Sequence, residues 1–168
     1  MEIDKNIKKV LDFFEEKNIK YEEIFFHREV FSVEDVNSLE KEIPGRGIKT
    51  LFLRDRKGKR FYLVSVWDKK ENVSLEYLAD RLGEKRLNFA TESNLNNILF
   101  VKPGSITPTA LINDKDGVVK FVLDRDLFNA DLVAMHPNLN TATIILERGN
   151  FLKMLENSTS DYIVVDIK

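Results

Sequence analysis

The spacing of apolar residues along the chain predicts several amphipathic helices. Near the amino terminus, apolar side chains recur at intervals of three and four residues: Ile3, Ile7, Val10, Leu11 and Phe14. This spacing places them on one face of a helix over residues 4–17, which is expected to pack against the rest of the protein. Further helices are expected at 32–42, 74–82, 91–99 and 149–155. Ser32, Ser74 and Thr91 are placed to cap three of them.

Short runs of apolar, β-branched and aromatic residues predict strands between these helices. They lie at 21–27, 48–53, 60–67, 86–89, 109–112, 118–123, 132–135, 141–146 and 162–167. Tight turns predict three hairpins, one around Gly58, one around residues 113–117 and one around His136. Many short strands with helices between them indicate an α+β fold. We expect a single domain over residues 1–168, with a curved, largely antiparallel sheet and inserted helices.

Composition narrows the class of protein. The 168 residues are 43% hydrophobic and include 12 Phe, which is enough for one well-packed core. The chain has no cysteine, so disulfides, thiolate nucleophiles and cysteine-based zinc sites are excluded. Its two histidines lie far apart in the sequence, and no acidic cluster accompanies them, so neither a metal nor another cofactor is expected.

Charge and hydropathy predict the compartment and the kind of partner. The amino terminus lacks the basic and apolar run of a signal peptide, and no apolar stretch approaches the roughly 18 residues of a membrane span. We therefore expect a cytoplasmic protein that has no membrane partner. It is also expected to be a monomer or to associate weakly. Since 26 basic and 28 acidic side chains give a net charge of -2, any contact with nucleic acid must be local.

One local basic segment stands out between two predicted strands. Residues 54–60 contain five cations, Arg54, Arg56, Lys57, Lys59 and Arg60. A solvated hairpin turn explains such a segment through solubility alone. The alternative is contact with the phosphates of a nucleic acid.

Three further segments contain residue types that bind small polar ligands. Lys49 follows a Gly-x-Gly turn and is either an ordinary exposed lysine or a point charge for a phosphate or ribose oxygen. Gly104 and Pro108 enclose a short loop, which is either a surface turn or a rigid array of amide N–H groups that stabilises a developing oxyanion. His136, held extended by the proline after it, is a general base, a pocket wall or a structural residue.

Motifs of other enzyme classes are absent from the sequence. It has no Gly-x-Ser-x-Gly elbow, Walker loop, dinucleotide fingerprint or His-Glu-x-x-His motif. An enzyme without a strong side-chain nucleophile needs an activated substrate.

Taken in order, the three segments resemble a known family. GRGIKTLFL at 45–53, GSITP at 104–108 and HPNLNTAT at 136–143 are similar to the freestanding aminoacyl-tRNA editing proteins of the YbaK and ProX family. The similarity runs from about residue 30 to about residue 166, and Thr50 stands where the family has asparagine.

The resemblance implies roles for particular residues. Catalytic roles fall on Lys49, Gly104 and His136. Substrate contacts fall on Val30, Phe31, Thr50, Ser105, Ile106, Thr107, Pro108, Asn140 and Thr141. Contacts with the tRNA acceptor stem are expected from Arg54, Arg56, Lys57, Lys59 and Arg60.

The activity that the resemblance implies is hydrolysis of mischarged Ala-tRNA(Pro) in trans, with the terminal ribose hydroxyl of the substrate helping to position water. A second pocket that is too small for proline completes a double sieve. The expected partners are aminoacylated tRNA(Pro) and prolyl-tRNA synthetase. Two alternatives stay open: a deacylase for another small amino acid, such as cysteine on tRNA(Pro), and a non-catalytic sensor of the tRNA end or of an amino acid.

Overall fold

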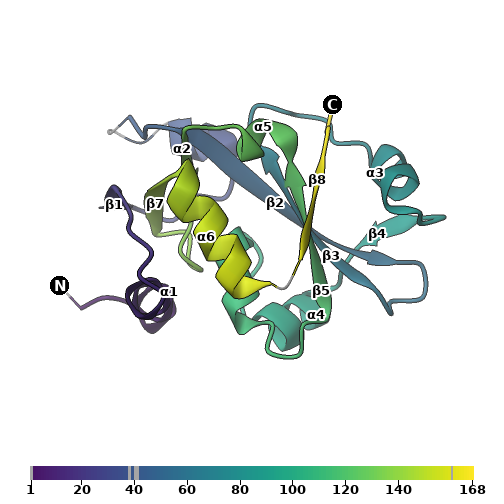
Figure 1. Ribbon diagram of the computed structural model, residues 1–168, viewed down its shortest axis with the longest axis horizontal. Coiled ribbons are helices and arrows are strands. Elements are labelled where there is room, and N and C mark those ends of the chain that lie inside the picture. Colours follow the sequence, from purple (N-terminus) through teal and green to yellow (C-terminus); the bar gives the residue numbers. More distant parts are fainter. Residues whose placement is uncertain (1, 38, 40–41, 160) are drawn as a thin grey trace.

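The computed structural model describes residues 2–37, 39, 42–159 and 161–168 (Figure 1). Its helical elements are α1 (Lys5–Glu16), α2 (Val33–Asn37), α3 (Leu75–Leu82), α4 (Glu92–Asn94), the π-helix η1 (Leu95–Leu99), the 3-10 helix η2 (Pro108–Asn113), α5 (Arg125–Phe128) and α6 (Arg148–Ser158). Its strands are β1 (Glu23–Phe26), β2 (Arg46–Asp55), β3 (Phe61–Trp67), β4 (Leu87–Phe89), β5 (Val119–Asp124), β6 (Leu132–Met135), β7 (Ala142–Glu147) and β8 (Tyr162–Val165).

The strands form one sheet in the order β1-β7-β6-β2-β3-β5-β8, with β4 paired to β2. Pairing is antiparallel for β1/β7, β6/β7, β2/β3 and β2/β4. It is parallel for β2/β6, β3/β5 and β5/β8. The expected α+β fold with a mostly antiparallel sheet is therefore confirmed, as are the hairpins around Gly58 and His136.

The expected hairpin around residues 113–117 is wrong. The segment before that turn is the buried 3-10 helix η2, and β5 after it pairs in parallel with β3 and β8. Pro108 opens η2 with a fixed φ and no N–H to donate, which suits a helix start. A short apolar run does not distinguish a buried helix from a buried strand, so the sequence pattern was ambiguous here.

Two other helices differ from their expected lengths. The helix expected at 32–42 is the short α2, and its remaining positions include 38, 40 and 41, which lie outside the described residues. The helix expected at 91–99 begins as α4, capped by the Thr91 side chain at the Asn94 N–H, and continues as the π-helix η1. Thr91 thus starts a helix as expected.

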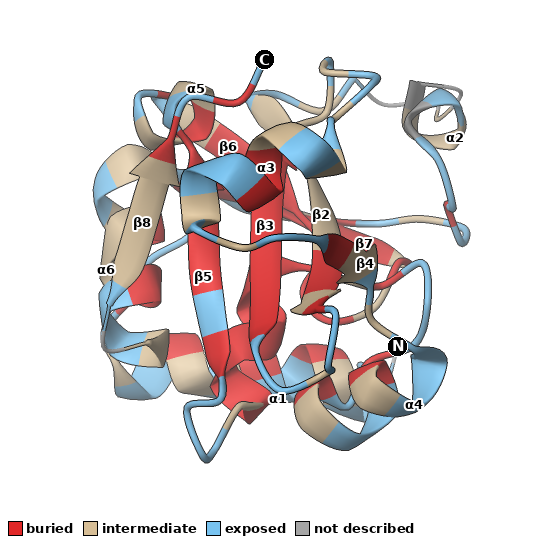
Figure 2. Ribbon diagram, turned by 90° about the vertical axis from the view of Figure 1, so that its right-hand side faces the viewer, coloured by how far each residue is buried: buried red, intermediate tan, exposed pale blue. Residues whose placement is uncertain are grey.

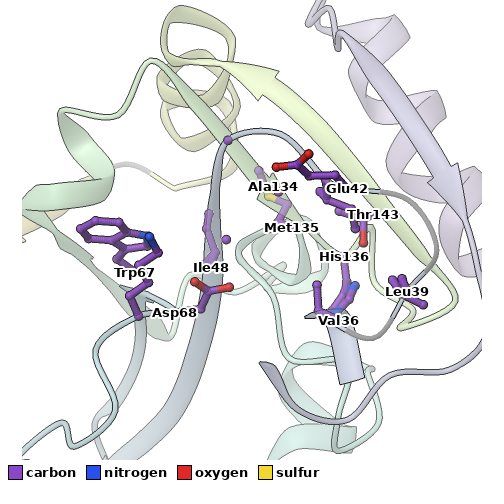
Figure 3. Close-up of a pocket in the computed structure, with 14 residues that line it drawn as sticks. Val36, Leu39, Glu42, Ile48, Trp67, Asp68, Ala134, Met135, His136 and Thr143 are labelled. Carbon is purple, nitrogen blue, oxygen red and sulfur yellow. The ribbon is translucent and has the colours of Figure 1, made fainter. Parts of the chain in front are cut away.

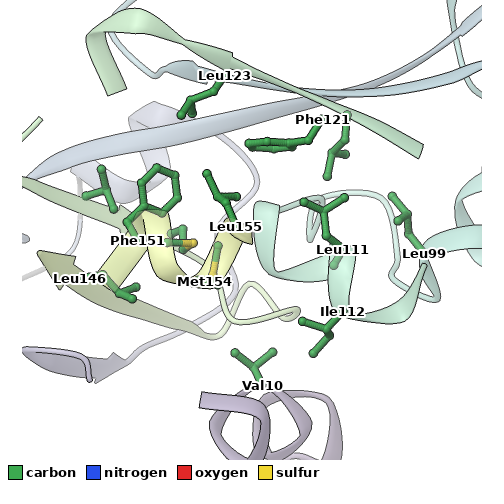
Figure 4. Packing of buried hydrophobic residues seen from close by; sticks show 14 of the residues in the cluster. Val10, Leu99, Leu111, Ile112, Phe121, Leu123, Leu146, Phe151, Met154 and Leu155 are labelled. Carbon is green, nitrogen blue, oxygen red and sulfur yellow. The ribbon is translucent and has the colours of Figure 1, made fainter. Parts of the chain in front are cut away.

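Side-chain alternation along the strands builds a core on both faces of the sheet. Leu63 of β3 belongs to the larger cluster, which includes Phe151 and Leu155 of α6 (Figure 4). Val64 of the same strand belongs to a second cluster with Leu78 of α3, which lies over β3 and β5 (Figure 2). Because adjacent side chains point to opposite faces, both sides of β3 are buried and the strand is held rigidly.

No helix within the described ranges is long and apolar enough to cross a membrane.

Candidate active site

A cavity of about 270 Å³ lies beside the first half of β2. Three of its lining residues are the ones expected to be catalytic, Lys49, Gly104 and His136. Four more are among the expected substrate contacts: Val30, Phe31, Thr50 and Ile106. The fold thus brings residues from distant parts of the sequence to one hollow.

Lys49 enters this cavity from β2, where its backbone pairs with Val66 of β3. The Lys49 ammonium donates to the backbone carbonyls of Lys70 and Glu71, which follow β3. Two carbonyl partners leave one N–H of the ammonium for a ligand. The neighbouring Thr50 hydroxyl is 2.9 Å from the Ser65 hydroxyl across the hairpin, so it is fixed by its strand partner.

The loop that begins at Gly104 has the conformation that its glycine permits. Gly104 has a φ of +86°, and a Cβ there would lie 2.9 Å from the Phe31 ring. The Ser105 N–H donates to the Lys102 carbonyl within the turn, at 3.0 Å. Among the described residues the N–H groups of Gly104 and Ile106 have no protein acceptor, so they are available to a ligand.

His136 is anchored through both its backbone and its ring. Its carbonyl accepts from the hydroxyls of Thr107 and Thr109, at 2.5 and 3.1 Å. Its Nδ1 lies 2.8 Å from the Ala142 carbonyl oxygen, an acceptor, which assigns the proton to Nδ1 and leaves Nε2 as the acceptor. Burial lowers the pKa of His136, the bond to Ala142 opposes this, and the nearby His27 adds to it. The imidazole is therefore neutral at physiological pH.

Five of the expected substrate contacts do not line this cavity: Ser105, Thr107, Pro108, Asn140 and Thr141. Thr107 holds the His136 carbonyl, as described above, and Pro108 opens η2. The Asn140 amide donates to the Val30 carbonyl at 2.8 Å, and its backbone N–H donates to the Ser105 hydroxyl at 3.1 Å. Ser105, Thr107 and Asn140 thus position residues that line the cavity. Direct contact with a substrate stays a prediction for all five residues.

The basic segment lies at the opposite end of the β2–β3 hairpin. Lys49 and Arg54 are five positions apart along β2, about 16 Å at the usual rise of an extended chain. Arg60 is bound to Glu84 by two hydrogen bonds, at 2.7 and 2.9 Å, and to Asp55 by an ion pair at 3.2 Å. Arg54 donates to the Asn94 side chain at 3.3 Å. Arg56, Lys57, Lys59 and Arg60 are exposed to solvent, and Arg54 is partly buried.

The cations of the basic segment differ in whether an acidic side chain binds them. The cations with exposed side chains and no acidic partner among the described residues are Arg56, Lys57 and Lys59. Contact of this segment with tRNA is not decided by the fold and stays a prediction.

Sequence reasoning missed Asp68, which follows β3 and lines the cavity. Asp68 also lines an adjoining hollow of about 550 Å³, shown in Figure 3, which shares Val36, Ile48 and His136 with the first. In Figure 3 Asp68 lies beside Ile48, and the Trp67 indole points away from His136. The hairpin pairing of Ile48 with Trp67 is the signal that would have placed Asp68 next to the Lys49 strand.

Comparisons with known proteins agree with this geometry. The model of the aminoacyl-tRNA editing domain matches residues 27–154. The prolyl-tRNA editing protein ProX of Acetoanaerobium sticklandii is 33% identical over 141 residues, covering 84% of this chain and 85% of that protein. The prolyl-tRNA synthetase associated domain-containing protein 1 of Bos taurus is 37% identical over 148 residues, covering 86% and 85%.

A solved structure supports the fold. The crystal structure of a candidate trans-editing enzyme for prolyl-tRNA synthetase superposes with a TM-score of 0.76 at 17% identity, over 99% of both chains. The fold, the cavity and these relatives define an aminoacyl-tRNA deacylase, an enzyme that hydrolyses the ester between an amino acid and a tRNA. The chain belongs to the aminoacyl-tRNA editing domain family, which confirms the resemblance to the YbaK and ProX proteins.

Proposed function

We propose that this protein removes alanine from mischarged tRNA(Pro), acting in trans on the product of prolyl-tRNA synthetase. Support comes from the convergence of Lys49, the Gly104 loop and His136 on one small cavity. The names of the bacterial and vertebrate relatives, which refer to prolyl-tRNA, favour proline tRNA over other acceptors.

The polar groups of the cavity suit hydrolysis of an ester by water. As water adds to the ester carbonyl, the carbonyl oxygen becomes negative, and fixed N–H donors stabilise it more than they stabilise the substrate. The Lys49 ammonium and the N–H groups of Gly104 and Ile106 are such donors. The terminal ribose hydroxyl of the tRNA helps to position the water, as the family resemblance implies.

His136 has a different role in this proposal. Its ring is neutral, held by Ala142, and forms one wall of the cavity. We assign it the positioning of the substrate, with Nε2 as a hydrogen-bond acceptor. General base catalysis by the same nitrogen is the alternative, and the pH dependence described in the Discussion bears on it.

Exclusion by size at a second site is the proposed basis for choosing a small amino acid. A synthetase for proline discriminates weakly against alanine, because a missing methylene changes binding by only about 1 to 3 kcal/mol. In this proposal, Val30, Phe31 and Ile106, which line the cavity, form a side-chain pocket that admits a methyl group and excludes the proline ring. The two steps together form a double sieve.

Selection of tRNA(Pro) over tRNA(Ala) requires contacts outside this cavity. We assign them to Arg56, Lys57 and Lys59, whose exposed side chains lie about 16 Å or more along the hairpin from Lys49. Transient association with prolyl-tRNA synthetase, and action as a cytoplasmic monomer, belong to the same proposal.

The test is a deacylation time course with purified protein on Ala-tRNA(Pro), with Ala-, Cys-, Ser- and Pro-charged tRNAs compared in parallel. The proposal expects fast loss of alanine from tRNA(Pro), slow loss from tRNA(Ala) and no loss of proline. Faster hydrolysis of Cys-tRNA(Pro) would move the assignment to cysteine. Binding of charged tRNA(Pro) without any accelerated hydrolysis would leave a sensor.

A further inference from the structure

The charges that line the 270 Å³ cavity are unequally partnered. Within the described part of the chain, Lys49 is its lining ammonium and Asp68 its lining carboxylate. The Lys49 ammonium is held by the backbone carbonyls of Lys70 and Glu71. No hydrogen bond or ion pair to the Asp68 carboxylate is found among the described residues.

The position of Asp68 is nevertheless well defined. Its backbone N–H donates to the Gly47 carbonyl at 3.0 Å, which ties the end of β3 to β2. A Cβ on Gly47 would lie 1.9 Å from Oδ2 of Asp68, so the carboxylate occupies the space that a side chain at Gly47 would need. Gly47 lies in β2, and the close approach of the carboxylate explains a glycine inside a strand.

A half-buried carboxylate without a hydrogen-bonding partner is unfavourable in the free protein. Burial raises the pKa of Asp68, and the positive charges of Lys49 and Lys69 oppose this only in part. A cation that binds beside the carboxylate would remove this penalty, since opposite charges in a partly dry site attract strongly.

The substrate that we propose carries such a cation. An aminoacyl ester has three distinct parts near the scissile bond: a carbonyl that becomes negative, a small side chain and an α-ammonium. Lys49 and the free N–H groups of the Gly104 loop suit the first part, and Val30 and Ile106 suit the second. The third part needs an anion, and Asp68 is the carboxylate among the described residues that line the cavity.

We infer that Asp68, seated against Gly47, binds the α-ammonium of the aminoacyl group. This inference rests on the proposed function and adds a specificity-determining residue to the same cavity. It makes the enzyme selective for esters with a free, charged amino group. It also orients the ester, because the ammonium on Asp68 and the carbonyl on Lys49 fix two points of one small group.

The experiment compares two esters of nearly equal shape on the same tRNA(Pro). One is alanyl-tRNA(Pro), and the other is lactyl-tRNA(Pro), made from it by chemical deamination, in which an uncharged hydroxyl replaces the ammonium. Each value of kcat/KM is divided by the rate of spontaneous hydrolysis of that ester, because the ammonium also activates the ester. The unmodified protein is expected to prefer the alanyl ester by about 30-fold or more, the effect of one desolvated charge pair.

The Asp68→Asn variant keeps the shape of the side chain and removes its charge. Its preference for the alanyl ester is expected to fall to about threefold or less, through slower alanyl hydrolysis with the lactyl rate little changed. The Gly47→Ala variant displaces the carboxylate without removing it and is expected to show the same loss of preference. The matched control is Glu42→Gln, which neutralises a nearby carboxylate of the adjoining hollow and is expected to leave the ratio unchanged.

Measured stability separates this role from a structural one. Loss of an unpartnered, partly buried charge is expected to leave the unfolding midpoint of Asp68→Asn unchanged or higher. The inference would be overturned if Asp68→Asn slowed hydrolysis of both esters equally, or if the unmodified protein did not prefer the alanyl ester. Either result would leave the proposed function standing. An unmodified protein that hydrolyses neither ester would overturn the proposed function, and the inference with it.

Discussion

The two ends of the β2–β3 hairpin differ in how their charges are partnered. At the turn, Arg60 binds Glu84 and Asp55, and Asp55 in addition accepts from the Lys59 and Arg60 N–H groups at 2.7 and 2.9 Å. At the other end, Lys49 binds only backbone carbonyls and Asp68 binds no side chain among those described.

The pKa shifts of the two ends follow the same difference. The hydrogen bonds from Arg60 lower the pKa of Glu84, as they do that of Asp55, because each carboxylate is stabilised by partners. The pKa of Asp68 is raised instead. Charges that stabilise the fold are neutralised within the protein, and charges at the site are left for a ligand. The predictions below test this distinction.

The largest expected effect is that of Lys49→Ala on catalysis. Removal of a positioned donor to a developing oxyanion typically lowers kcat by about 100-fold to 1000-fold, and we expect a loss in this range. The unfolding free energy should change by less than about 1 kcal/mol, since the ammonium binds only two backbone carbonyls at the edge of the cavity. Deacylation rates and urea denaturation measure the two quantities.

A variant at the other end of the hairpin is the control for Lys49→Ala. Lys59→Ala removes the same side chain type from an exposed position and should leave kcat unchanged. A Lys49→Ala protein that is as active as the unmodified one would place the chemistry elsewhere.

The next effect concerns the Gly104 loop. Gly104→Ala strains a positive φ and places a Cβ 2.9 Å from Phe31, whereas Gly117→Ala strains a similar φ of +64° with no atom within 4 Å. We expect Gly117→Ala to lower the unfolding free energy by about 1 kcal/mol, and Gly104→Ala to lower it further and also to slow deacylation. Equal stability and activity of the two variants would show that the contact with Phe31 has no importance.

The pH dependence of His136 gives a smaller, graded effect. Burial lowers its pKa from 6.5, so the folded imidazole stays neutral where the unfolded one has begun to take up a proton. Between pH 6.5 and the lowered pKa the unfolding free energy should fall as the pH falls, and this loss should stop below the lowered pKa. The activity, corrected for spontaneous hydrolysis, should stay level through pH 6.5 and decline only at lower pH.

An NMR titration of the imidazole signals tests this directly. The signal that disappears in His136→Gln should titrate with a midpoint below 6.5. A midpoint at or above 6.5 would contradict a neutral, buried ring, and it would favour an exposed base.

The smallest expected effect on chemistry is that of the basic turn. Changing Arg56, Lys57 and Lys59 together to Gln should raise KM for charged tRNA(Pro) by several-fold, leave kcat unchanged and reduce the salt dependence of binding. The Arg60→Gln variant should instead lower stability, because it leaves Glu84, which is largely buried, without its ion-pair partner. If the triple variant selects tRNA(Pro) over tRNA(Ala) normally, a different surface reads the acceptor stem.

The sequence predicted those parts of the fold that depend on neighbouring residues. Helix α1 follows from apolar spacing, α3 from its Ser74 cap and its Gly83 stop, and the β2–β3 hairpin from the turn at Gly58. The helix η2 was mistaken for a strand because its apolar run is too short to show a period. The parallel pairing of β5 with β3 and β8 depends on packing between distant segments, which local patterns do not contain.

The candidate site was predictable through the family resemblance and incompletely through chemistry. Lys49, Gly104 and His136 line one cavity as the motif order suggested. The position of Asp68 emerges only when β3 folds back on β2 and brings it against Gly47. Likewise, Arg60 pairs with Glu84, which lies 24 positions further along the chain. The sequence of the basic segment alone therefore suggested more cations without an acidic partner than the structure has.

The most direct test of the account is one deacylation experiment with Ala-tRNA(Pro), in which the unmodified protein and Lys49→Ala are followed side by side. The account predicts rapid release of alanine by the unmodified protein, and release slower by about 100-fold or more by a Lys49→Ala protein that is folded to the same stability. Equal rates for the two folded proteins would contradict the claim that the active site lies at the end of the β2–β3 hairpin that carries Lys49.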